Sequence, residues 1–311
     1  MERNHRFATW MGAVLGMSLA LLLNVALARA LDDDTWCDSK SDGSSQFHKC
    51  DTDQEKTRVS EEFHHTYPLT ANGRIALKNI NGAVHISVWD QNEVKVDAVK
   101  RAQNQDQLKD AEIVVDNRAD SISIETKYHE RDKNFRYFDG RNNPASIEYT
   151  LTVPRNAQLD EVKLINGGLD VTGVTGEVHA SCINGKLTAR GLSARVKLTT
   201  INGPLDANFD RLPAASVELS SINGPVELTM PSDAKASIEA TTIHGGIDND
   251  FGLHTNDHRF VGHDMSGELG GGGAEIRLNN VNGPIHVHHA KDGHALSPAR
   301  DIGDRHSGDS I

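Results

Sequence analysis

One short motif recurs along this sequence: isoleucine or valine followed by Asn-Gly, or once by His-Gly. The motif occurs seven times, and from the second copy onward the spacings are 18, 18, 21, 21 and 38 residues. A repeat of about twenty residues is too short for a pair of helices and predicts a β-solenoid, in which each coil packs only on its neighbours. The last two residues of the motif are Asn81-Gly82, Asn166-Gly167, Asn184-Gly185, Asn202-Gly203, Asn223-Gly224, His244-Gly245 and Asn282-Gly283.

We call each Asn-Gly or His-Gly pair a corner. A short strand is expected on each side of every corner. Apolar residues lie six and four positions before the Asn and three and five positions after it, as Val217, Leu219, Val226 and Leu228 do around Asn223. Alternation with a period of two is typical of half-buried strands. The isoleucine or valine just before the Asn breaks this alternation, so we expect the corner to turn that side chain inward.

The main alternative is a series of hairpins, because Asn-Gly between alternating strands is a strong hairpin signal. Proline follows the glycine in three copies, at Pro204, Pro225 and Pro284. The residue after the glycine of a two-residue hairpin must donate its N–H across the turn, and proline has no N–H. The prolines therefore favour corners of a coil, where Asn and Gly accept positive φ.

The corner asparagines are also candidates for a ladder of side-chain hydrogen bonds. Stacked coils would bring equivalent amides together and satisfy polar groups at the bends. His244 replaces asparagine in one copy, which we expect to weaken the ladder. Such a ladder would stabilise the fold without giving it an activity. Its expected members are Asn166, Asn184, Asn202 and Asn223.

Residues 1–30 are typical of an export signal peptide. Arg3 and Arg6 precede an apolar run over residues 10–28, and Ala28 and Ala30 are small enough for a cleavage site. The run is long enough for an uncleaved membrane anchor, which stays open as the alternative. We therefore expect a protein of the periplasm or cell surface, with a flexible mature N-terminus over residues 31–59.

The chain has three cysteines. An oxidising compartment would pair Cys37 with Cys50 in a disulfide. The alternative is a metal site that these two cysteines form with His48. Cys182 stands where other copies carry threonine or serine, so we interpret it as a small residue of the coil wall rather than as a nucleophile.

The chain of 311 residues carries a net charge of −12 at pH 7. This balance disfavours nucleic acid as a partner, because phosphates require a positive surface. It also disfavours passive binding to anionic lipid. Hydrophobic residues make up 37% of the chain but aromatic residues only 5%, which suits a long narrow core.

The remaining domain boundaries follow from changes in pattern along the chain. Residues 60–153 form an N-terminal β-strand region, with a helical turn at 105–110 and an exposed loop at 129–144. The solenoid repeats extend over residues 154–289, where an insertion at 252–273 precedes one closing coil. Residues 290–311 are rich in Gly, Pro, Ser, Asp and His, which predicts a disordered tail.

Three segments resemble a bacterial family of β-strand-repeat proteins, a domain of unknown function known as "putative adhesin". They are Tyr-Thr-Leu-Thr-Val-Pro-Arg at 149–155, four glycines at 270–273 before Glu-Ile-Arg-Leu at 275–278, and Ile-Asn-Gly-Ala-Val-His-Ile at 80–86 with Trp-Asp at 89–90. The likeness covers residues 60–289 and departs from the family motif at His244. It implies a β-repeat fold and an adhesive role, and it carries over no catalytic residues.

A row of polar residues is expected four positions after the corners. In register they would lie about 4.8 Å apart, so their carboxylates could recruit Ca²⁺. The alternative is a solvated face whose repulsion salt screens. The threonine in the row and the absence of a Gly-Gly-x-Gly-x-Asp signature favour the solvated face. The row consists of Asp170, Thr188, Asp206, Glu227 and Asp248.

Two groups of histidines suggest a metal site without completing one. Zinc needs three or four ligands that converge on one point, and both groups border segments expected to be flexible. We therefore predict no metal-binding residues and no cofactor. The groups are His254, Asp257, His258, His263 and Asp264 in the insertion, and His286, His288, His289 and His294 near the C-terminus.

A carbohydrate-active enzyme on a β-helix is the alternative from a different class. Its site would need converging carboxylates on long loops, whereas most coils here have only 18–21 residues. Only residues 129–144 and 252–273 could form a cleft. The sequence contains no Gly-x-Ser-x-Gly, His-Glu-x-x-His or phosphate-binding glycine motif, so we predict no catalytic residues.

The sequence therefore predicts an exported, non-catalytic, all-β protein. We expect an adhesin or envelope surface module that binds through a rigid repetitive face. Its partner would be a protein or glycan of the envelope or matrix, and open solenoid ends could add self-association. The alternative within this class is a periplasmic scaffold or sensor accessory tethered by an uncleaved leader.

Overall fold

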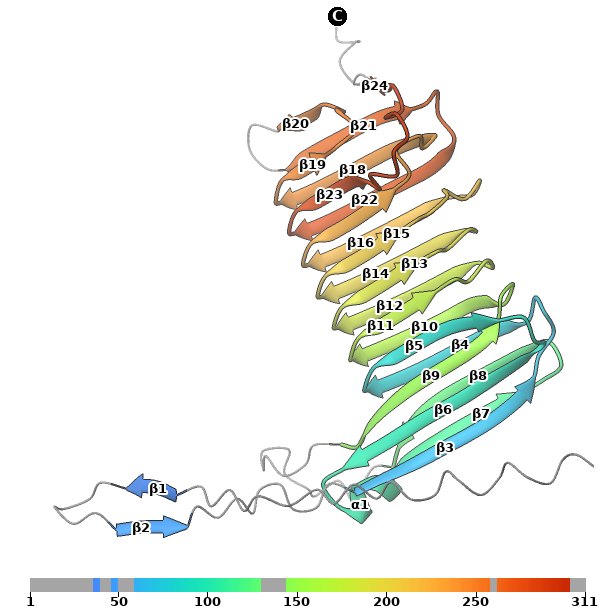
Figure 1. Cartoon of the computed structure of the whole chain (residues 1–311), viewed down its shortest axis with the longest axis vertical. Helices are drawn as coiled ribbons and strands as arrows, with labels where there is room; N and C mark the ends of the chain where they lie inside the picture. The colour runs from blue at the N-terminus through green and yellow to red at the C-terminus, as the bar shows by residue number, and fades with distance from the viewer. Residues whose placement is uncertain (1–35, 40–45, 50–58, 130–143, 258–261, 303–311) are drawn as a thin grey trace, which may run out of the picture. The chain divides into compact units, whose positions relative to one another are not determined.

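The computed structural model describes residues 36–39, 46–49, 59–129, 144–257 and 262–302, and it is all-β apart from one short helix in these ranges (Figure 1). The chain divides into two compact units, residues 1–56 and 57–311. In the first unit β1 (Trp36–Ser39) pairs antiparallel with β2 (Gln46–Lys49). The leader and Cys50 lie outside the described residues, so the export signal and the Cys37–Cys50 disulfide stay predictions.

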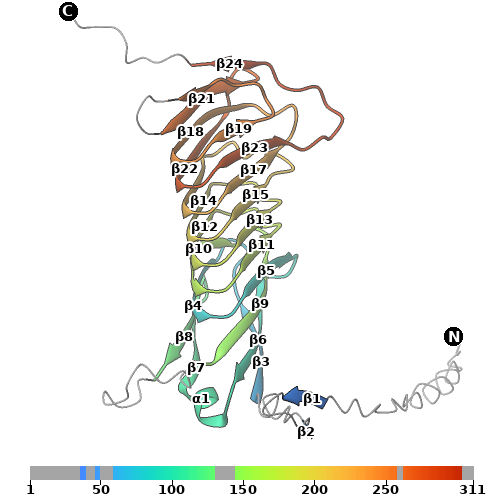
Figure 2. The same ribbon diagram turned by 90° about the vertical axis from the view of Figure 1, so that its left-hand side faces the viewer.

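The second unit is built from two large sheets that face each other (Figure 2). In spatial order, sheet I contains β20 (Thr255–Asp257), β21 (His263–Leu269), β18 (Ala236–His244), β22 (Ala274–Asn282), β16 (Val217–Asn223), β14 (Val196–Asn202), β12 (Val178–Asn184), β10 (Gln158–Asn166), β4 (Arg74–Asn81), β8 (Ser121–Tyr128) and β7 (Ala111–Asn117), with β24 (Ala299–Asp301) paired to β21. Sheet II contains β19 (Ile247–Asn249), β23 (Ile285–His289), β17 (Val226–Met230), β15 (Leu205–Asn208), β13 (Leu187–Arg190), β11 (Leu169–Thr172), β5 (Val84–Trp89), β9 (Ser146–Pro154), β6 (Glu93–Ala102) and β3 (Val59–Pro68).

Each repeat contributes one strand to each sheet. The strand before the corner lies in sheet I and the strand after it in sheet II, so the Asn-Gly pairs are not hairpin tips. Neighbouring repeats pair parallel and in register: Asn184 lies opposite Asn202, and Leu187 opposite Leu205. Equivalent residues of different repeats therefore line up in rows across both sheets.

The apolar side chains that alternate along the strands fill the space between the two sheets. They form one continuous core that extends from Leu69 to Val287. The first copy belongs to this stack, because β4 and β5 pair with β10 and β11. The boundary predicted between residues 153 and 154 therefore does not separate two cores.

The last repeat does not close the stack, contrary to the sequence prediction. Its strands β22 and β23 lie between those of the two preceding repeats, with Asn282 opposite Asn223 on one side and His244 on the other. The insertion explains this order. Strand β21 pairs antiparallel with the outer edge of β18, and the chain then returns to the inner edge, where β22 pairs in parallel.

Antiparallel strands extend the N-terminal end of the stack. Strand β6 pairs with β9 and β3, and β7 pairs with β8. The predicted helical turn is present as α1 (Gln105–Asp110), where the Asn104 side chain accepts a hydrogen bond from the Gln107 N–H. No helix in the described part of the chain is long and apolar enough to span a bilayer.

The C-terminal segment is ordered as far as residue 302, so the tail predicted from residue 290 is wrong up to that point. Ala290 N–H donates to the Met230 carbonyl and Ser297 N–H to the Ser232 carbonyl, both at 2.9 Å. Strand β24 then pairs with β21. Backbone pairing therefore orders a segment whose composition suggested disorder, and residues 303–311 lie outside the described ranges.

Candidate binding surface

The corner glycines allow neighbouring repeats to pack backbone on backbone. Their φ angles are between 116° and 157°, a region that residues with a side chain rarely adopt. A Cβ on Gly203 would lie 2.1 Å from the Gly185 carbonyl oxygen. The asparagines do not share this role, since Lys291 is the single described non-glycine residue with positive φ.

The corner asparagines form the expected ladder, and it is longer than predicted. From Asn166 onward, each Nδ2 donates to the Oδ1 of the preceding asparagine in the ladder at 2.8 or 2.9 Å. His244 does not interrupt the ladder, because its repeat lies beyond the last asparagine. In spatial order the ladder joins Asn81, Asn166, Asn184, Asn202, Asn223 and Asn282.

The position two residues before the corner points inward and is often polar. There the Cys182 thiol donates to the Gly167 carbonyl at 3.2 Å, and the Thr242 hydroxyl to the Gly283 carbonyl at 3.0 Å. Burial raises the pKa of the Cys182 thiol, so the thiol stays protonated. This observation favours the predicted wall residue over a nucleophile.

The residue directly before the corner points outward, because its predecessor points inward. Five of these isoleucines are 37–42% exposed and the other two residues are half-buried, so the predicted inward turn is wrong. Neighbours in the row are about 4.8 Å apart, which gives a row of about 29 Å. We call it the isoleucine row. In spatial order it contains Ile80, Ile165, Ile183, Ile201, Ile222, Val281 and Ile243.

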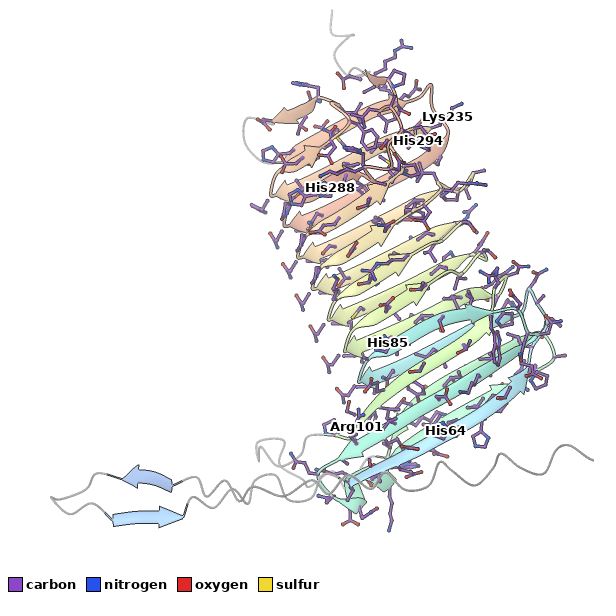
Figure 3. All side chains as sticks on the ribbon, viewed as in Figure 1. His64, His85, Arg101, Lys235, His288 and His294 are labelled. Carbon is purple, nitrogen blue, oxygen red and sulfur yellow. The ribbon has the colours of Figure 1, made fainter. Side chains whose placement is uncertain are left out.

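Side chains project at regular intervals along the edge where the repeats turn (Figure 3). Two further rows lie beside the isoleucine row on the outer face of sheet I. The outermost row holds ion pairs such as Lys197–Glu218 at 3.0 Å and Arg277–Glu239 at 3.9 Å. Between them is an uncharged row, which we call the polar row. It contains Ser181, Thr199, Ser220, Asn279 and Thr241.

The row predicted to be acidic carries mixed charge. The inserted last repeat places His286 between Glu227 and Asp248, and His286 Nδ1 is 3.4 Å from an Asp248 oxygen. Lys186 Nζ lies 3.4 Å from Asp206. These partners offset the repulsion that would recruit Ca²⁺, which favours the solvated face.

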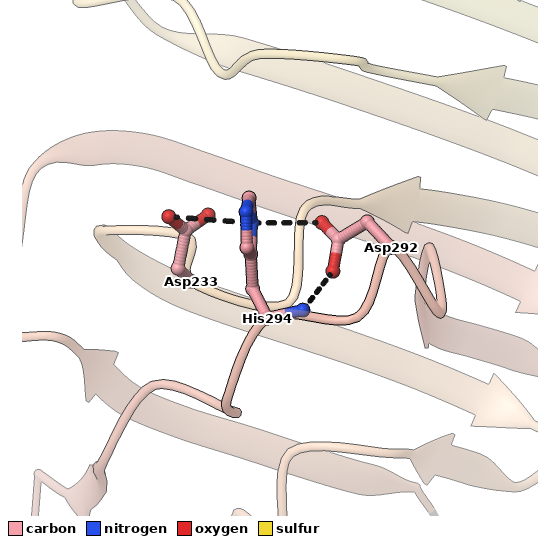
Figure 4. Close-up of side chains that lie close together, drawn as sticks. All are labelled: Asp233, Asp292 and His294. Carbon is pink, nitrogen blue, oxygen red and sulfur yellow. Dashed lines mark hydrogen bonds and ion pairs between the residues drawn. The ribbon is translucent and has the colours of Figure 1, made fainter.

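Several of the predicted histidines pair with single carboxylates. His263 Nδ1 is 2.6 Å from Asp257, and His288 Nδ1 is 3.3 Å from Asp250. The predicted His258 lies outside the described residues. His294 is different, because it faces both Asp233 and Asp292 (Figure 4). Sequence reasoning overlooked Asp233, whose only signal is its place in the connection between β17 and β18.

A pocket of about 450 Å³ lies at the N-terminal end of the second unit. Its Glu61 carboxylate is 2.9 Å from the amine of the buried Lys100, and its Glu112 is 3.5 Å from His129. Both carboxylates therefore have a basic partner.

No family model and no curated protein matches this chain. A "putative cell adhesion protein" of Clostridium sporogenes is similar in structure, with 13% identity, coverage of 75% of this chain and 100% of the other, and a TM-score of 0.43. A "putative adhesin" of Bacteroides fragilis has 13% identity, 74% and 97% coverage, and a TM-score of 0.28. A "putative lipid binding protein" of Parabacteroides distasonis has 8% identity, 74% and 97% coverage, and a TM-score of 0.27.

Proposed function

We propose that this chain is an exported, non-catalytic β-solenoid that binds a partner of the cell envelope or matrix through the isoleucine row and the adjoining polar row. The observation that supports this function is the exposed isoleucine row. Single exposed aliphatic residues are normal on protein surfaces, whereas contiguous apolar patches mark interaction sites. Here every repeat presents one exposed or half-buried aliphatic residue at the same position, so together the residues form a contiguous row.

The two rows complement each other chemically. Burial of the isoleucine methyl groups would contribute hydrophobic free energy to a complex, and the hydroxyls and amides of the polar row can fix the orientation of a ligand. One repeat offers only a small contact. The stack offers the same contact several times on a rigid frame, so a partner with its own regular repeat would bind with avidity and little loss of conformational entropy.

We call the isoleucine row and the polar row together the strip. The partner that suits this strip is an extended polymer, either a glycan or an extended protein segment. Apolar sugar faces and aliphatic side chains can both pack on isoleucine methyl groups. The strip carries no charge in five adjacent repeats of a chain whose net charge is −12, which supports a neutral partner. Attraction to a strongly charged polymer would need a charged strip.

Binding of the purified exported chain to a glycan array and to immobilised envelope and matrix preparations tests this function. The variant Ile183→Thr/Ile222→Thr keeps β-branched residues at exposed positions and should reduce binding at least tenfold. The matched control Lys197→Thr/Glu218→Thr changes the outermost row of the same face and should bind like the wild type. Equal binding by all three proteins would contradict the proposal.

The non-catalytic part of the proposal needs a separate experiment. The same glycans should be recovered unchanged after prolonged incubation with the protein. Shortened or unsaturated oligosaccharides, detected by mass spectrometry, would instead favour a carbohydrate-active enzyme.

A further inference from the structure

Two segments far apart in the sequence meet at the edge of the stack opposite the corners. One is the connection between β17 and β18, and the other follows β23. The Ser232 N–H donates to Asp292 Oδ2 at 3.1 Å, and the Ser297 N–H donates to the Ser232 carbonyl at 2.9 Å. These bonds hold the segments together and bring the side chains of Asp233, Asp292 and His294 to one place (Figure 4).

The spacing of these side chains fits a bound metal ion. His294 Nδ1 lies 3.6 Å from an oxygen of Asp233 and 3.6 Å from an oxygen of Asp292, and the three ligand atoms lie within 4.8 Å of one another. A separation of 3.6 Å is too long for a hydrogen bond. Tetrahedral zinc, with bonds of about 2.0–2.2 Å, separates its ligand atoms by about 3.4 Å.

His64 provides a useful contrast, because it also lies between two carboxylates. Its Nδ1 is 2.8 Å from Asp97 and its Nε2 is 3.2 Å from Glu62, so each nitrogen makes its own hydrogen bond. His294 directs a single nitrogen toward both carboxylates. Neither carboxylate lies within hydrogen-bond distance of this nitrogen, whereas its lone pair and both carboxylates can coordinate one cation.

The surroundings of Asp292 suit a metal ligand. The backbone N–H groups of Ser232 and His294 each donate a hydrogen bond of 3.1 Å to the Asp292 carboxylate. These bonds fix the orientation of the carboxylate. The side chains of Asp233 and His294 are 63% and 62% exposed, which lets an ion reach the site and leaves room for water as a further ligand.

We propose that Asp233, Asp292 and His294 bind a divalent transition-metal ion, Zn²⁺ by preference, which fastens the C-terminal segment to the connection between β17 and β18. The imidazole favours Zn²⁺ over Ca²⁺ and Mg²⁺, which prefer oxygen ligands alone. The fastened segment leads to β24, which pairs with β21 at the end of sheet I. The ion therefore stabilises the strands that cover this end, a role distinct from binding at the isoleucine row.

Zinc titration of the metal-free exported chain by calorimetry tests the site. We expect one Zn²⁺ per chain at this site, and affinity reduced at least tenfold by Asp233→Asn and by His294→Gln. Both side chains are exposed and make no hydrogen bond within the described residues, so both variants should fold. Asp292 is left intact because it also holds Ser232. His64→Gln is the matched control and should bind Zn²⁺ like the wild type.

Three results would overturn the site: equal affinity in the wild type and Asp233→Asn, an equal loss in His64→Gln, or binding of Ca²⁺ without binding of Zn²⁺.

Hydrogen exchange tests separately whether the ion fastens the C-terminal segment. Zn²⁺ should slow exchange over residues 290–302 in the wild type and leave it unchanged in His294→Gln. Tight Zn²⁺ binding with no change in exchange would contradict that role.

Discussion

The two long edges of the stack differ in how closely their residues repeat. At the corner edge every repeat but that of His244 turns through Asn-Gly, and the glycine carbonyls, asparagine amides and isoleucines form rows. At the opposite edge the connections that follow β11, β13, β15 and β17 differ in sequence, and the one after β15 is longer than the other three. The first edge can therefore present an extended surface, whereas the second can hold a single site such as the one at His294.

The difference has a physical origin in the distance between backbones. At the corners a Cβ would meet the carbonyl of the next repeat, so each repeat must use glycine there. At the opposite edge Gly191 has φ of 62°, but a Cβ on this residue would lie 3.7 Å from its nearest neighbouring atoms. Replacement of glycine by alanine should therefore lower the free energy of unfolding by different amounts at the two edges.

The largest expected effect is at a corner glycine. Gly203→Ala places a Cβ about 2 Å from a backbone oxygen at a φ of 149°, so it should lower the free energy of unfolding by more than about 3 kcal/mol or prevent folding. Gly191→Ala should cost only about 1–2 kcal/mol, the usual penalty of a left-handed residue. Urea denaturation measures both, and equal costs would show that the corner backbones are not in contact.

The asparagine ladder should give an intermediate effect. Asn202→Leu removes the bonds to Asn184 and Asn223 and should cost about 1–3 kcal/mol, since each hydrogen bond contributes about 0.5–1.5 kcal/mol. Asn208→Leu, in the same repeat at the opposite edge, is the control and should cost less. Thermal unfolding compares them, and a larger cost at Asn208 would contradict a stabilising ladder.

The smallest effect concerns pH at the variable edge. Because the pKa of Asp292 is lowered from 3.8 to about 2, its ionised form stabilises the fold above its ordinary pKa, and this contribution is lost as pH falls through about 2. NMR titration of the carboxyl carbon should show this midpoint. Ser232→Ala should raise the pKa toward its ordinary value, and an unchanged midpoint would mean that the hydroxyl is not the main cause.

Much of the regular region could be predicted from the sequence. The Asn-Gly corners, the strand on each side of them and the helical turn at 105–110 all follow from local patterns. Proline after three of the glycines was enough to favour corners over hairpins, and the two strands of each repeat do lie in different sheets.

The errors arose where the outcome depends on packing between distant segments. The break in apolar alternation before each corner predicts inward isoleucines, which is wrong. The inward position before them is polar in most copies, and the neighbouring glycine carbonyls explain why Thr242 or Asn280 is buried there. The order of the last repeats depends on antiparallel pairing of β21, which the sequence pattern does not encode. His294 and Asp233 likewise meet only because hydrogen bonds join two segments that are distant in the sequence.

Disulfide trapping along the isoleucine row tests most directly whether equivalent residues line up in the observed spatial order. In a Cys182→Ser background, the pair Ile222→Cys/Val281→Cys lies in adjacent repeats, about 4.8 Å apart, and should form a disulfide on mild oxidation, identified by peptide mass spectrometry. The pair Ile222→Cys/Ile243→Cys is separated by a further repeat and should not. A disulfide in the second pair and none in the first would contradict the account.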